Sequence, residues 1–175
     1  MDTSTLENIA EDLISHKLQL YGLLVAKPKS DRFGTDLLVF SEIADNVKFC
    51  RIQNKGRSFR GSPTSNIKIC KNYVTNGFLC VLYLEFNDNF QDLFIFFPNE
   101  IRNWNLNSND EYQLNLSKST ASEQLKRFRF ESSKIGLIKM LIKNAETQGE
   151  FKGLVQGFIN ITEENDTVKS HGSVK

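Results

Sequence analysis

Two apolar runs near the middle of the chain constrain its fold most strongly. Phe78–Leu84 runs without a charge until Glu85, and Leu93–Phe97 follows closely. Both runs have strand-like length and aromatic content, so they predict strands buried on both faces at the centre of a sheet. The longer run is far below the ~20 residues that a membrane-spanning helix needs. The chain is therefore expected to fold around a β-sheet.

A helix is predicted before the sheet. Apolar residues recur at helical spacing from Leu6 to Tyr21, and Ser4 with Glu7 matches a capping box, which predicts a start near Ser4. Gly22 is the expected stop.

The remaining patterns complete an α/β fold class. A helical stripe runs from Ile135 to Ala145, and a second capping box is expected at Thr120 and Glu123. Residues 160–175 lack apolar periodicity and predict a disordered tail after a single domain over residues 1–159. Further strands are expected at 23–27, 36–40, 47–55, 67–70 and 112–116.

Composition excludes several classes of protein. The 175 residues include 22 Lys and Arg against 21 Asp and Glu, giving a net charge of +1, and 39% are hydrophobic, which indicates a folded globular protein. The acidic amino terminus lacks signal-peptide features, and three cysteines without CxxC spacing favour a reducing compartment. We therefore expect a cytoplasmic protein that does not enter the membrane.

Near-neutrality hides a basic segment at residues 47–71. It contains seven cations and no Asp or Glu, so the rest of the chain sums to 1 − 7 = −6. Such a segment is either a footprint for phosphate groups or a set of solvated charges. Its cations are Lys48, Arg51, Lys55, Arg57, Arg60, Lys68 and Lys71.

Four polar residues near the ends of the first predicted elements could form a catalytic site. Gln53 and Lys55 alternate along one predicted strand and so share a face. Asp36 opens the preceding strand, so a hairpin would bring it close to them, and Glu11 lies on the first helix. Oxygen ligands beside a lysine suit a divalent cation that polarises a phosphodiester.

These residues resemble the PD-(D/E)xK phosphodiesterase superfamily, which has a restriction-endonuclease-like fold. The resemblance rests on Gly34-Thr35-Asp36, Gln53-Asn54-Lys55 and Ala10-Glu11, the last lying eleven residues before Gly22-Leu23. The pattern is most similar to archaeal Holliday-junction resolvases and their uncharacterised bacterial relatives. It covers residues 5–85, about half of the chain.

The resemblance implies a mixed β-sheet flanked by helices, with additional C-terminal strands and a helix. It also implies Mg²⁺ or Mn²⁺ held by Asp36, Gln53 and Glu11, with Lys55 orienting the attacking water. The substrate would be DNA, contacted by Arg57, Arg60 and Lys48, and resolvase-like relatives are often homodimers. Two positions depart from the motif: Thr35 replaces the proline, and the neutral Gln53 replaces a carboxylate.

Each residue also has a structural interpretation, and other functions stay open. Asp36 could cap its own turn, Gln53 and Lys55 could form an exposed strand end, and Glu7 is the rival of Glu11 on the same helix face. Glu11 is preferred because the predicted capping box already occupies Glu7. Asp31 is a lesser candidate ligand. The alternative functions are a catalytically degenerate module that binds nucleic acid or protein, and a structural interaction domain.

Overall fold

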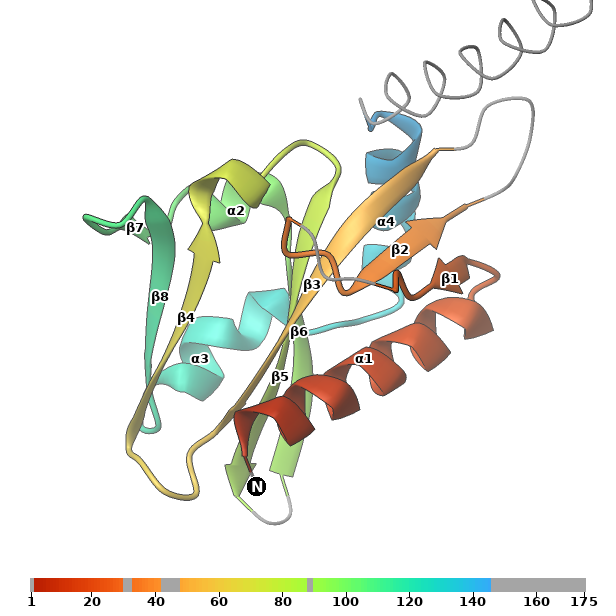
Figure 1. Ribbon diagram of the computed structural model, residues 1–175. Coiled ribbons are helices and arrows are strands. Elements are labelled where there is room, and N and C mark those ends of the chain that lie inside the picture. Colours follow the sequence, from red (N-terminus) through yellow and green to blue (C-terminus); the bar gives the residue numbers. More distant parts are fainter. Residues whose placement is uncertain (1, 30–32, 42–47, 88–89, 146–175) are drawn as a thin grey trace, which may run out of the picture.

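A five-stranded mixed sheet lies at the centre of the structure, which is a computed structural model describing residues 2–29, 33–41, 48–87 and 90–145 (Figure 1). The strand order is β1-β2-β3-β5-β6, with β3 and β5 parallel and the other neighbours antiparallel. The strands are β1 Leu24–Ala26, β2 Leu37–Phe40, β3 Phe49–Ser58, β5 Phe78–Asn87 and β6 Phe90–Phe96.

The longer apolar run forms β5, as predicted, because both of its faces are buried. Its even-numbered residues, such as Cys80 and Leu82, belong to one core, and its odd-numbered residues, such as Val81, belong to a second core. The prediction for β6 needs correction, since this strand is last in the order rather than central. Its outer side is covered by the later chain, where the N–H of Phe130 donates to the carbonyl of Leu93.

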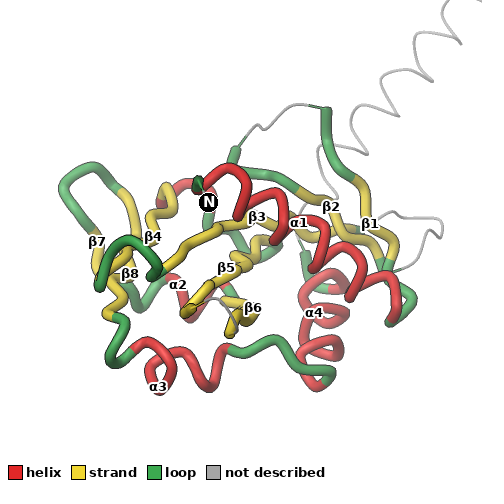
Figure 2. The backbone as a smooth tube through the Cα atoms, turned by 90° about the horizontal axis from the view of Figure 1, so that it is seen from below, coloured by secondary structure: helices red, strands yellow, loops and turns green. Residues whose placement is uncertain are grey.

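A second, three-stranded sheet packs on one face of the first. Its order is β4-β8-β7, from β4 Thr64–Cys70, β8 Glu111–Ser117 and β7 Asn105–Leu106. The short helices α2 Pro98–Ile101 and α3 Ala121–Leu125 contribute to the same core, and single 3-10 turns lie at Lys71–Tyr73 and Lys126–Phe128. Figure 2 shows these elements on one side of β3, β5 and β6, with the longer helices on the other. The predicted α/β fold class, with its additional C-terminal strands and helix, is confirmed.

Two longer helices cover the opposite face. The helix α1 spans Thr3–Leu20 and buries one residue per turn against the sheet, while α4 spans Ser133–Lys143 and buries three isoleucines there. Gly22, with a φ of +76°, follows the end of α1 and confirms the predicted stop. None of the helices formed by the described residues combines the length and apolar character that crossing a membrane requires.

The start of α1 at Thr3 agrees with the prediction within one residue, but its cap differs. Its cap is Asp2, whose carboxylate accepts a 2.7 Å hydrogen bond from the N–H of Thr5. The predicted capping box of Ser4 and Glu7 is therefore wrong, because the side chain that satisfies the first turn comes from two residues earlier. Thr120 does lie at the cap position of α3, but it makes no side-chain hydrogen bond there within the described part of the chain.

Candidate active site

The candidate site lies where β3 extends beyond the end of its pairing with β2. The pairing of β2 with β3 ends at Leu37 and Ile52, and the N–H of Asp36 then donates to the carbonyl of Ile52 at 2.9 Å. The strand β3 continues to Ser58, paired with β5 on its other side. Residues 53–58 thus form an edge that the first half of α1 approaches.

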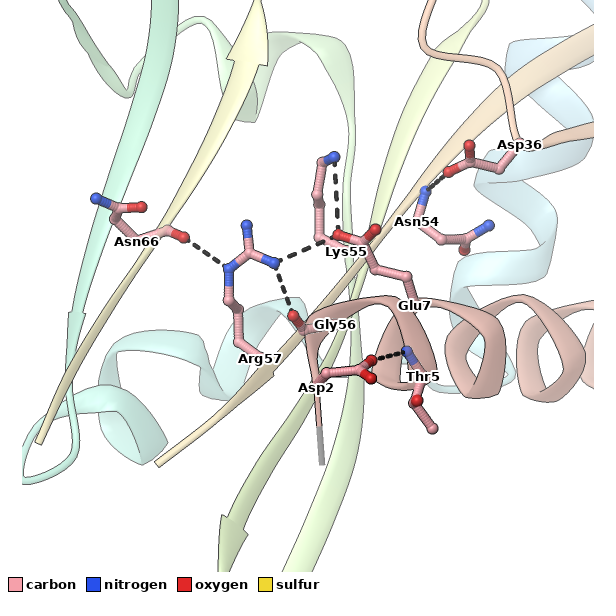
Figure 3. A network of polar contacts seen from close by, with 9 residues as sticks. All are labelled: Asp2, Thr5, Glu7, Asp36, Asn54, Lys55, Gly56, Arg57 and Asn66. Atoms are coloured by element: carbon pink, nitrogen blue, oxygen red, sulfur yellow. Dashed lines mark hydrogen bonds and ion pairs between the residues drawn. The ribbon is translucent and has the colours of Figure 1, made fainter. Parts of the chain in front are cut away.

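Asp36 is fixed to this edge by its side chain. Its Oδ2 atom accepts a hydrogen bond from the backbone N–H of Asn54, so the carboxylate extends the ladder beyond the last residue pair of β2 (Figure 3). The carboxylate is half-buried. This anchoring to β3 holds the acid at the position that the hairpin argument predicts.

Lys55 and Glu7 meet at the same edge. Glu7 reaches from α1 so that its Oε1 lies 3.9 Å from the Lys55 Nζ and 3.3 Å from the NH1 of Arg57. Arg57 also donates through Nε to the carbonyl of Asn66 at 2.8 Å and through NH1 to that of Gly56 at 2.7 Å. Arg57 therefore joins α1, β3 and β4, as Figure 3 shows, and holds Glu7 beside the lysine.

Gln53 lies on the same face of β3 and is 8% exposed. Among the described residues, its side-chain oxygen Oε1 has no hydrogen-bond partner, which is costly for a buried polar atom. Gly34 lies against it: a Cβ added at Gly34 would be 2.8 Å from the Gln53 Nε2 and 2.5 Å from the ring of Tyr73. A glycine at position 34, with its φ of +61°, lets the backbone before Asp36 approach Gln53 closely.

The pKa of the Cys80 thiol is affected by burial and by the charges near this edge. Cys80 on β5 is in register with Gln53, and burial raises its pKa to about 12, so it is an inert neutral thiol. Two positive groups, Lys55 and Arg57, lower this pKa, while Asp36 and Glu7 raise it. Burial dominates the shift, and these four charges make smaller contributions of opposite sign.

Glu11, the predicted helix ligand, has a different partner. Its carboxylate forms an ion pair with Lys27, and this hydrogen-bonded contact is the largest cause of the raised pKa of Lys27. The charges of Asp12 and Asp36 also raise that pKa. Because the capping argument against Glu7 fails and Glu7 lies beside Lys55, Glu7 becomes the stronger candidate. The spacing of Glu7 and Glu11 on one helix face was the signal available for it.

The cations predicted to bind DNA all have partners within the protein. Lys48 donates to the carbonyl of Lys143, and it lies roughly 23 Å along β3 from Lys55 at 3.3 Å per residue. Arg60 forms a 2.7 Å ion pair with Glu85, which is 3% exposed. Of the three predicted cations, Arg57 contacts Glu7 beside Lys55.

The other cations of the basic segment are paired as well. Lys68 lies 3.7 Å from Glu111, and Lys71 lies 3.6 Å from Asp110. Arg51 donates to the carbonyl of Phe33 at 3.1 Å. The acids that pair with the cations of this segment thus come from elsewhere in the chain.

Some predictions fall outside the described residues. Asp31 is one of them, and so is the predicted tail over residues 160–175. Within the described ranges, no group of three or more His, Cys, Asp or Glu side chains is arranged to hold a metal ion.

Comparison with known proteins supports the fold. No protein-family model matches the sequence, and no curated protein matches it. Among solved structures, the bacterial homing endonuclease I-Ssp6803I is similar, with a TM-score of 0.54 and 14% sequence identity. The similarity covers 81% of this chain and 94% of that chain. The chain therefore has an endonuclease-like α/β fold.

Proposed function

We propose that this protein is a divalent-metal-dependent nuclease that hydrolyses phosphodiester bonds in DNA, with a site of the PD-(D/E)xK type. The observation that carries the proposal is that Asp36 is bonded to β3 at Asn54, between Gln53 and Lys55, with Glu7 beside Lys55, on an endonuclease-like fold. A carboxylate, an amide oxygen and a lysine at one strand edge suit phosphodiester chemistry.

The side chains fit Mg²⁺ or Mn²⁺. Asp36 and the Oε1 of Gln53 would act as ligands, with Glu7 or Glu11 bound directly or through water. The buried Oε1 has no partner within the described part of the chain, as expected for an oxygen reserved for a cation. Mg²⁺ commonly uses one or two carboxylates and keeps several waters. A bound ion would polarise the phosphodiester and lower the pKa of a water molecule.

Lys55 would orient the attacking water and offset the negative charge that develops on the phosphate. Its side chain is 19% exposed, so its charge acts where solvent screening is reduced. Glu7 restrains the lysine through the 3.9 Å contact, and Arg57 restrains Glu7. The chain thus provides a positioned cation before substrate binds, which avoids reorganisation during the reaction.

Contacts with the DNA backbone remain assigned to Arg57, Arg60 and Lys48. Arg60 is the most suitable by exposure, since its side chain is 45% exposed while Glu85 holds its inner side. A guanidinium has five N–H donors, so it can keep an internal acceptor and also bind a phosphate.

A catalytically degenerate DNA-binding module is the second candidate. Two observations favour it: the neutral Gln53 in the motif, and the lack of a three-acid cluster within the described ranges. The two functions are separated by incubating the wild-type protein with supercoiled plasmid, linear duplex and single-stranded DNA. Cleavage that needs Mg²⁺ or Mn²⁺ and stops with EDTA supports the nuclease, whereas binding without cleavage supports the module.

Gln53→Glu should tighten Mn²⁺ binding on the order of tenfold and keep or raise cleavage. An added unit charge about 4 Å from a divalent cation is worth ~2 kcal/mol even at the dielectric constant of water, before its own desolvation is subtracted. Calorimetric titration with Mn²⁺ and the metal dependence of cleavage measure the effect. Gln19→Glu is the matched control, since Gln19 lies exposed at the far end of α1. Equal Mn²⁺ affinity in both variants and wild type would remove Gln53 from the metal site.

Glu7→Gln should slow cleavage by at least about 10²-fold, and Glu11→Gln by less than about tenfold. Glu7 touches Lys55, while Glu11 is held by a lysine that is 64% exposed. Single-turnover cleavage rates at saturating Mg²⁺ compare the two variants. Both should fold, because partly exposed ion pairs contribute little to stability. The reverse order of effects would make Glu11 the helix ligand, as the family resemblance implies.

A further inference from the structure

Phe33 has an unusual position for an aromatic residue. Its side chain is 68% exposed, and its backbone is left-handed, with a φ of +59°. Asp110, at φ +56°, is the other such non-glycine residue among those described, and it lies in the turn before β8, where Asp is common. Phe33 has no polar side chain to compensate, so both its exposure and its backbone conformation are unfavourable for the free protein.

The backbone that carries Phe33 is held firmly. Its carbonyl accepts a 3.1 Å hydrogen bond from NH1 of Arg51. The NH2 group of Arg51 donates to the carbonyl of Tyr73 at 2.9 Å and to the Oγ1 of Thr75 at 3.1 Å. The next residue, Gly34, is buried against Tyr73. The exposed ring is therefore mounted on a backbone anchored to β3 and to the turn at Lys71–Tyr73.

This mounting places the ring at the rim of the candidate active site. Gly34 lies against the Gln53 amide, and Phe33 precedes Asp36 by three residues, a span of at most about 11 Å. Each strand of DNA has one phosphate per 3.4 Å of helix axis. The Cα atom of Phe33 thus lies within about three nucleotides' length of that of Asp36, so its exposed ring can reach a base near a phosphate bound there.

We propose that Phe33 stacks on a nucleobase of the DNA substrate that is unpaired or has left the base stack beside the phosphate to be cut. This inference rests on the proposed nuclease function and deepens it, because it names the preferred substrate as DNA with a locally unstacked base. Aromatic side chains stack on any base, and apolar side chains also enter flexible base steps. Bound DNA would cover the exposed ring.

Binding of defined oligonucleotides by the full chain tests the proposal. The probes are a 30-nucleotide duplex with one unpaired 2-aminopurine, the same duplex fully paired, and the single strand, all in EDTA and low salt. Wild type should prefer the unpaired probe over the paired duplex. Phe33→Ala should weaken binding to the unpaired probe by about 5- to 150-fold, the range expected for one stacked base. Tyr21→Ala is the matched control, since Tyr21 is an exposed aromatic at the far end of α1.

A spectroscopic variant gives a second measurement that does not depend on affinity. The chain has one tryptophan, Trp104, so Phe33→Trp in a Trp104→Phe background reports on position 33 alone. Stacking should quench the fluorescence of both the indole and the 2-aminopurine. This quenching, together with the loss of affinity in Phe33→Ala, supports the proposal.

The other outcomes overturn the proposal in distinguishable ways. Normal binding and cleavage by Phe33→Ala, without quenching in Phe33→Trp, would reject the role of Phe33 and leave the nuclease in place. A change from dimer to monomer in Phe33→Ala during sedimentation, again without quenching, would assign the ring to a protein contact. Wild-type protein that neither binds nor cuts any DNA probe would reject both the proposed function and this inference.

Discussion

Asp36→Ala and Lys55→Ala should each reduce metal-dependent cleavage by about 10²–10³-fold, equivalent to roughly 3–4 kcal/mol of transition-state stabilisation. The first change removes a charged ligand that is fixed to the N–H of Asn54. The second removes the cation that is held beside Glu7 and opposes the charge developing on the phosphate. Plasmid nicking under single-turnover conditions, with Mg²⁺ and with Mn²⁺, measures both losses.

Controls must separate lost chemistry from lost structure. Asp36→Asn keeps an oxygen that can accept from Asn54 but removes the charge, so it should fold as wild type does and still fail to cleave. Asp12→Ala and Lys118→Ala make the same changes at exposed positions and should cleave normally. If Lys55→Ala cuts DNA as fast as wild type, the assignment of this lysine is wrong, and the strongest part of the motif falls with it.

The sequence predicts the sheet better than it predicts the site, because the sheet depends on local patterns. The alternation of β3 places Gln53 and Lys55 on one face, and the antiparallel pairing of β2 brings Asp36 to the same edge. These relations need only strand phasing and one hairpin. Even so, an apolar run does not reveal the position of its strand in the sheet. The strand β6 lies at the sheet edge and is buried because the later chain, at Phe130, covers it.

The choice between Glu7 and Glu11 could not be made from sequence. Both lie on one face of α1, and which of them reaches Lys55 depends on where the helix lies along β3. The helix cap at Asp2 shows how a plausible local motif can mislead: Ser4 and Glu7 have the right spacing, but the chain turns into the helix earlier.

The basic segment at residues 47–71 illustrates a second limit. Its seven cations have no acid nearby in sequence, which favours a phosphate footprint, but the fold brings an acid to five of them: Glu7, Glu85, Glu111 and Asp110 are the acids. A run of cations in the sequence therefore does not form an unpaired basic surface in the folded protein. An interface with DNA would have to compete with these internal contacts or share their guanidinium groups.

Gly56→Ala should destabilise the protein by about 3 kcal/mol and disturb the site as well. An added Cβ would lie 2.4 Å from the backbone carbon of Leu6 and 2.5 Å from the backbone nitrogen of Glu7. Helix backbone cannot rotate away as a side chain can, so α1 must move off β3, and overpacking of this kind typically costs about 1–3 kcal/mol or more. The midpoint of thermal unfolding should fall by roughly 6–12 °C for a chain of this size.

Gly136→Ala is the matched control, because it makes the same change in the exposed interior of α4, where an added Cβ meets nothing within 4 Å. It should stabilise the protein by about 0.5–1 kcal/mol, because alanine favours a helix more than glycine does. Both variants replace glycine with alanine, so the effect on the entropy of the unfolded chain is the same in the two. Urea unfolding compares the two. Because Glu7 moves with α1, Gly56→Ala should also slow cleavage below its unfolding temperature, as a misplacement of about 1 Å can cost ~10²-fold in rate. Equal stability in both variants would mean that α1 does not pack on β3 at Gly56, and the argument that brings Glu7 to Lys55 would fail.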